Sequence, residues 1–192
     1  GLVTLITSFF LVPGTYGENL SPFNAMGLIG LLYFYILHGF IYSIVSQAGF
    51  FAFLFINRIG LGIFRSFWPT VQYVLVAFVI FEIVFLSHKA TEGEVALFWW
   101  ILMAGALLAY GIFIAYVKAK ETNRRAFAPA LFLMIVMTTI EWVPGLQAEG
   151  TDYAVLMIFT LLACNTYQLL MLHRLAKQDA EKSVEPKKIA KA

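Results

Sequence analysis

Long uncharged runs separated by short polar turns occupy the chain up to about residue 173. A helix needs roughly 17–25 apolar residues to cross the hydrocarbon of a bilayer, and it satisfies its own backbone groups there. The periodicity is helical or featureless, unlike the two-residue alternation of a membrane β-barrel. The pattern predicts an all-α, polytopic integral membrane helical bundle. Its single domain, residues 1–173, would have about six transmembrane helices, at residues 1–12, 24–47, 69–87, 95–117, 126–143 and 153–173.

Two of these runs differ from an ordinary span in length. Residues 1–12 are too few to cross, so we expect a first helix truncated at its N-terminus, with residues 13–17 breaking it and further sequence upstream. A cleaved signal peptide is the rival interpretation, although no charged segment precedes the run. The second run is too long for one span, so we expect a helix over residues 24–47 that is followed by a bend, by a re-entrant segment or by a continuation of the helix to about residue 56. Residues 58–65 would then lie at the interface.

The run from residue 126 to residue 143 has the most sharply marked ends. Arg124 and Arg125 precede it, and Trp142 stands at its other end as an interfacial anchor, where Pro144 and Gly145 are expected to end the helix. The composition agrees with a membrane protein, because only 12% of the 192 residues are charged, against about 25% in soluble domains. The one cysteine, Cys164, allows neither a disulfide nor a paired-cysteine metal site and is expected to be a small buried side chain.

The distribution of charge predicts the orientation. Twelve of the thirteen Lys and Arg fall on alternate connections, residues 57–68, 118–125 and the tail 174–192, and the thirteenth is Lys89. By the positive-inside rule both termini would be cytoplasmic. The tail would start as a helix and become disordered. Anionic lipid headgroups, and not nucleic acid, are the expected partners of the basic turns, at Arg58, Arg65, Lys118, Lys120, Arg124 and Arg125.

Polar residues inside the apolar runs are the candidates for a site. A charge at Glu82 costs roughly 2.5–3.5 kcal/mol on insertion scales, so we expect this residue to face the bundle or to be protonated. Glu141 lies at a helix C-terminus, where the dipole disfavours an anion, so it needs a partner. Both residues have either a structural role or one in ligand or proton handling. His38 is expected to bond a nearby Tyr or Ser, or alternatively Glu82.

Three amides complete this candidate set. Gln47, Asn165 and Gln168 are expected to make interhelical hydrogen bonds. Gly105 and Ala109 stand four residues apart, a spacing that permits close helix packing.

No signature of a known enzyme is present. The chain lacks a serine nucleophile elbow, a zinc-binding helix motif and a glycine-rich phosphate loop. With three histidines at different depths, neither a metal site nor another cofactor is expected. An enzyme would have to work within the membrane, with Cys164 or Ser46 as its nucleophile.

Four stretches carry a resemblance to a known family: SQAGFFA at 46–52, RIGLGIFR at 58–65, TTIEWVP at 138–144 and LACNTYQLL at 162–170. They resemble the KinB-signalling pathway activation (KbaA) family of spore-forming bacteria. The resemblance implies a six-span membrane protein that promotes activation of a membrane sensor histidine kinase feeding the sporulation phosphorelay. It implies no reaction and no functional residues.

The leading hypothesis is therefore a non-enzymatic accessory that biases the state of the kinase through transmembrane helix contacts. The alternative is a small-solute sensor or transporter with a polar cavity lined by Glu82, Glu141, His38 and Gln47. An intramembrane enzyme ranks third. The oligomeric state stays open.

Overall fold

The computed structural model describes residues 1–20, 23–90, 96–149 and 151–189, which are helical and contain no strand. The prediction of an all-α chain is confirmed. In chain order the elements are α1 (Leu2–Leu11), α2 (Pro13–Leu20), α3 (Ala25–Phe64), η1 (Arg65–Phe67), α4 (Trp68–Ala90), α5 (Leu97–Glu121), η2 (Arg124–Ala126), α6 (Phe127–Phe132), the π-helical η3 (Leu133–Met137), α7 (Thr138–Glu149) and α8 (Thr151–Ile189).

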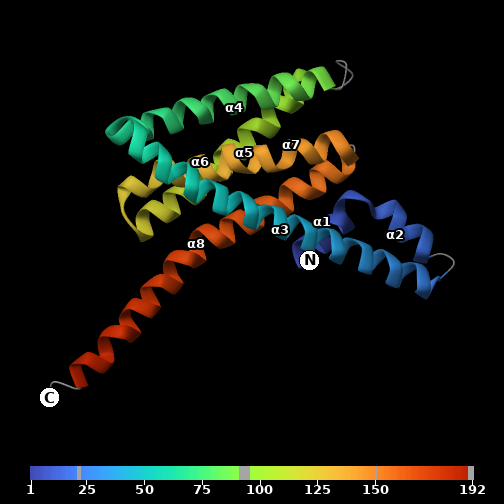
Figure 1. Cartoon of the computed structure of the whole chain (residues 1–192). Helices are drawn as coiled ribbons and strands as arrows, with labels where there is room; N and C mark the ends of the chain where they lie inside the picture. The colour runs from blue at the N-terminus through green and yellow to red at the C-terminus, as the bar shows by residue number, and fades with distance from the viewer. Residues whose placement is uncertain (21–22, 91–95, 150, 190–192) are drawn as a thin grey trace.

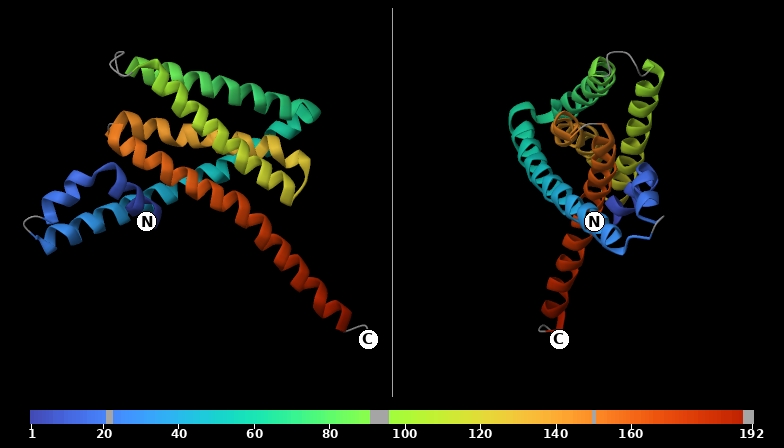
Figure 2. Two further views of the ribbon diagram at one scale, coloured as in Figure 1. Left: turned by 180° about the vertical axis from the view of Figure 1, so that it is seen from behind. Right: turned by 90° about the vertical axis from the view of Figure 1, so that its right-hand side faces the viewer.

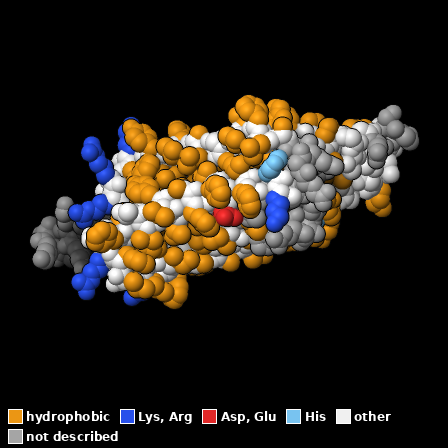
Figure 3. Space-filling model, turned by 90° about the horizontal axis from the view of Figure 1, so that it is seen from above, with side chains coloured by type: hydrophobic (Ala, Val, Ile, Leu, Met, Phe, Trp, Pro, Cys, Tyr) orange, Lys and Arg blue, Asp and Glu red, His pale blue; other side chains and the backbone are white. Residues whose placement is uncertain are grey.

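The long helices run between two ends of an elongated molecule (Figure 1). The turns η1 and η2 and the C-terminal half of α8 lie toward one end, and α2 and the C-termini of α4 and α7 lie toward the other (Figures 1 and 2). Hydrophobic side chains cover the middle, whereas most visible Lys and Arg gather at one end (Figure 3). The alternate connections that carry the basic residues therefore share one end of the fold.

Four stretches within the described residues are long and apolar enough to cross a membrane, judged by length and composition: Ala25–Phe85, Leu97–Glu121, Arg124–Val143 and Tyr153–Met171. The first of them contains α3 and most of α4. The chain reverses direction between these two helices, at η1 (Figure 1). The shorter α1 is also apolar. These helices are compatible with a membrane protein, and the predicted number of six spans stays a prediction.

Helix α3 is longer than expected. Its N-terminus is capped by the Asn24 side chain, which accepts a 3.0 Å hydrogen bond from the Gly27 backbone. It then continues for 40 residues, about 60 Å at 1.5 Å per residue. The structure therefore shows the continuation, and neither the bend nor the re-entrant alternative. Residues 58–64 are the last turns of this helix, and the expected position of the segment 58–65 at the interface stays a prediction.

The reversal between α3 and α4 depends on a polar corner. Arg65 adopts a positive φ of 49°, which ends α3. The Trp68 indole and the Gln72 amide both donate to Asn57 Oδ1, at 2.7 and 3.2 Å. A Cβ built on Gly60 would overlap the Trp68 ring, so only glycine lets the ring pack this closely. Helix α4 begins one residue before the predicted Pro69.

Two prolines that we expected at helix ends lie in helices instead: one begins α2, and the other lies within α7. The expected break of the first helix is present at Val12, but residues 13–17 are themselves helical, because Pro13 starts α2. Proline is favoured in a first helical turn, where its missing N–H has no partner to lose. The prediction that Pro144 and Gly145 end the central helix is wrong, since α7 continues to Glu149. The Trp142 indole donates to the Ala154 carbonyl at 2.7 Å and holds α7 against α8.

The continuous helix formed by α6, η3 and α7 is the centre of the bundle. Its apolar window is 72% buried, whereas those of the other three candidate spans are 17%, 22% and 44% buried. Every residue from Ala130 to Thr139 is buried. The run that the sequence marked most sharply is therefore the one around which the other helices pack.

Helix α8 reaches well beyond the bundle toward the basic end (Figure 2). The Lys118 amine donates to the Leu169 carbonyl at 2.7 Å, and Arg174 forms an ion pair with Glu121 at 2.6 Å. Both contacts join α5 to α8. The helical start predicted for the tail is confirmed and extends to Ile189. The disordered end, so far as it concerns residues 190–192, falls outside the described residues.

Candidate functional site

A buried polar network joins three helices in the core. The Asn165 amide nitrogen of α8 donates to Thr138 Oγ1 and to Glu141 Oε2 of α7, at 2.9 and 3.1 Å. The Asn165 amide oxygen accepts from Ser46 Oγ of α3 at 2.7 Å, and Ser46 Oγ also accepts from the Gln168 amide at 3.1 Å. Apart from the half-buried Gln168, all members are less than 9% exposed. Asn165 is the hub, because it is bonded to both other helices.

Glycine makes this meeting of helices close. A Cβ built on Gly49 would overlap Glu141 Oε1, which therefore lies directly against the backbone of α3. Gly49 and Ser46 are three residues apart, so both face the same neighbour. A larger residue at position 49 would have to push α3 away from α7.

The second carboxyl oxygen of Glu141 has no hydrogen-bond partner among the described residues. A buried ionised carboxylate with a single donor is costly. The arrangement resembles a structural hydrogen-bond network more than a site that stabilises charge.

The π-helical segment η3 lies directly before this network. Thr138 Oγ1 donates to the Leu133 carbonyl at 3.3 Å, and Thr139 Oγ1 donates to the Ile135 carbonyl at 2.7 Å. The hydroxyls thus bond carbonyls of the widened turn, where the regular helical ladder is shifted. Because one extra residue in the turn rotates everything after it, η3 sets the direction in which Thr138 and Glu141 face.

The structure brings together three of the six predicted polar residues: Glu141, Asn165 and Gln168. The expectation that Glu141 has a partner is confirmed. The sequence interpretation did not connect these residues with Ser46, Gly49 and Thr138. A pattern for finding them does exist, since each helix contributes a pair three residues apart, at 46 and 49, 138 and 141, and 165 and 168.

His38 lies elsewhere, in an aromatic group. Its Nδ1 is 2.9 Å from the Phe34 carbonyl, and its ring lies against Phe34, Tyr42 and Tyr153. Among the contacts of the described residues, none joins His38 to Glu82, so the alternative pairing is not formed. A histidine that bonds the preceding helical turn and packs between rings has a structural role.

Glu82 and Gln47 are not part of the network either. Glu82 is partly exposed on α4, and within the ranges that the structure describes it makes no hydrogen bond or ion pair. Its intermediate exposure places it neither in the enclosed core nor fully outside it, and the expectation that it faces the bundle or is protonated stays a prediction. Gln47 is exposed on α3. With these residues in separate surroundings, the cavity that the transporter alternative requires is not formed.

The predicted packing pair Gly105 and Ala109 is exposed, and a Cβ on Gly105 would meet no atom within 4 Å. As a contact within the described chain this prediction is wrong. Close packing of α5 occurs instead at Gly111, where a Cβ would lie 2.7 Å from Ile135 Cδ1 of the central helix. Two small residues four positions apart do not show which face of a helix meets its neighbour.

The two nucleophiles considered for an intramembrane enzyme have no base beside them in the described contacts. Ser46 Oγ donates a hydrogen bond to the Asn165 amide oxygen, and Cys164 is half-buried beside the Ser43 hydroxyl. An amide oxygen does not abstract protons. Within the described ranges no group of three His, Cys, Asp or Glu side chains is placed to hold a metal ion.

Comparison with known proteins identifies the family of this chain. Three of the four family-like stretches, at 46–52, 138–144 and 162–170, contribute its residues. A family model described as KinB-signalling pathway activation in sporulation matches residues 1–175. The KinB-signaling pathway activation protein of Bacillus subtilis (strain 168) is 37% identical over 180 residues, covering 91% of this chain and 90% of that protein. No solved structure matches. The chain belongs to the KbaA family, whose members are described by KinB-signalling pathway activation in sporulation.

Proposed function

We propose that this chain is a multi-pass plasma-membrane protein that promotes activation of a sensor histidine kinase in the sporulation phosphorelay, through transmembrane helix contacts and without catalysing a reaction. The family match over residues 1–175 carries the proposal. The name of the Bacillus subtilis relative connects that protein with the KinB signalling pathway. A kinase is the partner that this name suggests.

The surface supports a membrane location. Large hydrophobic side chains are exposed along most helices, for example Phe51 at 69%, Phe78 at 57% and Phe113 at 60%. Monomeric soluble proteins rarely expose contiguous apolar patches of more than a few hundred Å². A lipid surrounding removes this cost, and the basic residues gathered at one end would then meet the inner leaflet.

The buried network supports a role without catalysis. Ser46, Thr138 and Asn165 are bonded to one another and are completely buried. Such a network fixes the arrangement of α3, α7 and α8. It thereby gives the protein one defined outer surface for a partner.

The outer face of α4 is the part of that surface which fits a partner helix best. Val74, Phe78, Phe81 and Phe85 are 53–62% exposed, and their spacing of four, three and four residues places them on one stripe. Glu82 stands beside Phe81, partly exposed and without a described partner. In lipid a carboxyl group placed so costs energy. A kinase helix that brings a hydrogen-bond donor or a basic side chain to Glu82 would remove the cost.

Such contacts activate a kinase if they are stronger in its active state. Coupling energies of about 1–3 kcal/mol, or 5- to 150-fold in an equilibrium, are typical of allosteric effects. One hydrogen bond to a charged group, about 1.5–3 kcal/mol, lies in this range. Contacts of a kinase helix with the α4 stripe and Glu82 can therefore supply enough free energy for the proposed effect.

Two measurements test the proposal. Cells that lack this protein should show reduced kinase-dependent phosphorelay output, and restoring the intact chain should recover it. A photo-crosslinking residue at position 81 should then capture the kinase, whereas one at position 51, equally exposed but on α3, should not. Unchanged output without the protein would contradict the function. Capture from position 51 alone would contradict the choice of α4.

A further inference from the structure

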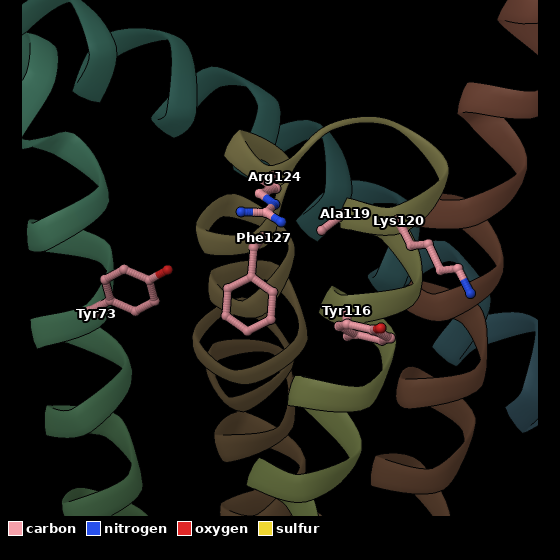
Figure 4. A pocket seen from close by; sticks show the side chains of 6 residues that line it. All are labelled: Tyr73, Tyr116, Ala119, Lys120, Arg124 and Phe127. Atoms are coloured by element: carbon pink, nitrogen blue, oxygen red, sulfur yellow. The ribbon is translucent and has the colours of Figure 1, made fainter.

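A pocket of about 580 Å³ opens at the basic end, between α4, α5 and the start of α6. Figure 4 shows Arg124 and Phe127 lying between Tyr73 of α4 and Tyr116 of α5. Ala119 and Lys120 complete its lining, and Lys120 extends along the far side, away from Tyr73. Three of the six lining residues are thus aromatic, and two are cations.

The cations of this pocket are not balanced by the neighbouring acid. Glu121 forms an ion pair with Arg174 of α8, and Lys118 donates to a backbone carbonyl. Among the described ion pairs, none includes Lys120 or Arg124. Both side chains are exposed, so they are accessible to an anion.

We propose that this pocket binds the phosphate of one anionic phospholipid headgroup. The inference rests on the membrane location proposed above. The Arg124 guanidinium, a planar fork of donors, matches a phosphate bidentately, and Lys120 supplies a second charge. The Tyr73 and Tyr116 hydroxyls offer further donors. Basic pockets between helices on the cytoplasmic side of a membrane bind anionic headgroups in this manner.

The apolar lining favours a lipid over free phosphate. Phe127 lies below Arg124 in the pocket (Figure 4), and Phe113 stands one turn before Tyr116 on the same face of α5, 60% exposed. An acyl chain leaving the headgroup can run along these rings. A free phosphate would bind the cations alone and leave the rings unused.

The test uses the full-length protein purified in a neutral detergent and native mass spectrometry, which counts the lipids that stay bound. Dioleoyl phosphatidylglycerol is the anionic probe, and dioleoyl phosphatidylcholine is the zwitterionic control. We expect one phosphatidylglycerol to bind at least about fivefold more tightly than phosphatidylcholine, as one or two interfacial charges provide. Millimolar inorganic phosphate should not displace it.

Two variants with the same change in charge decide whether the pocket is the site. Arg124→Gln should lower the affinity for phosphatidylglycerol by at least about fivefold. Arg125 does not line the pocket, so Arg125→Gln should leave the affinity within about twofold of that of the unchanged protein. Phe127→Ala should weaken both lipids and, if Arg124→Gln misfolds, provides the second variant. Equal losses in the two arginine variants would show diffuse attraction and overturn the site. Displacement by inorganic phosphate would overturn the lipid.

Kinase output is measured separately, so the two proposals fail separately. Selective lipid binding with no effect of this protein on the kinase would leave the lipid site standing. Loss of that selectivity with output intact would remove the site and leave the proposed function.

Discussion

Glu141 and Glu82 are both glutamates on apolar helices, and the structure gives them opposite surroundings. Glu141 is 7% exposed, accepts a hydrogen bond from Asn165 and lies against Gly49. Glu82 is partly exposed on α4 and has no described partner. A carboxyl group in an apolar run can therefore indicate either of two different surroundings. It is satisfied either within the chain or by something outside it, and only the second kind indicates a partner surface.

Removing the hub of the buried network should have the largest effect. Asn165→Leu would leave Ser46, Thr138 and Glu141 without their shared partner, and unpaired buried groups cost about 1–3 kcal/mol each. We expect the protein to lose about 3–4 kcal/mol of stability in detergent unfolding experiments. Asn165→Asp, which keeps two acceptor oxygens but no donor, should also be destabilising. A loss below about 1 kcal/mol would mean that the network does not hold the helices together.

The close contact beside Glu141 should be nearly as sensitive. Gly49→Ala places a methyl group on Glu141 Oε1, and overpacking costs about 1–3 kcal/mol. Gly62→Ala on the same helix is the matched control, since a Cβ there meets no atom within 4 Å. It should leave stability unchanged or raise it by up to about 1 kcal/mol, from helix propensity. Thermal unfolding of both variants measures the difference. Equal effects would contradict the proximity of α3 and α7.

A milder change is expected from Glu141→Gln. The glutamine oxygen can accept the hydrogen bond from Asn165, and only the oxygen beside Gly49 is replaced by an amide nitrogen. We therefore expect a loss of about 1 kcal/mol or less in the same unfolding measurement. Kinase output should follow the amount of folded protein. A loss above about 3 kcal/mol would show that the negative charge itself is required.

Much of this architecture was predictable from the sequence, and the contacts were not. The apolar runs predicted the long helices, because a run has to be buried or face lipid along its whole length. The position of Glu141, at the end of a charge-free run, predicted that it needs a partner. Its partner Asn165 lies 24 residues away along the chain, and the meeting of these two residues depends on how the helices rotate against one another.

That rotation is set by features that have no periodic pattern in the sequence. The π-helical segment η3 shifts the face of α7, and Gly49 decides how closely α3 approaches. Pro13 and Pro144 misled the prediction for a related reason. A proline removes one donor and restricts the preceding residue, but neighbouring contacts such as Trp142 with Ala154 decide whether the helix continues.

The sharpest test of the comparison is the same substitution at the other glutamate. Glu82→Gln should change stability by less than about 0.5 kcal/mol, because no described contact of this side chain is lost. Kinase output should nevertheless fall, by about five- to tenfold, if a basic side chain or donor of the kinase helix pairs with the carboxylate. Glu141→Gln would then alter stability with little specific effect on output, and Glu82→Gln the reverse. A partner helix needs a surface that the fold leaves unsatisfied, so unchanged output in Glu82→Gln, with the protein present at its normal level, would move the kinase contact away from this face of α4.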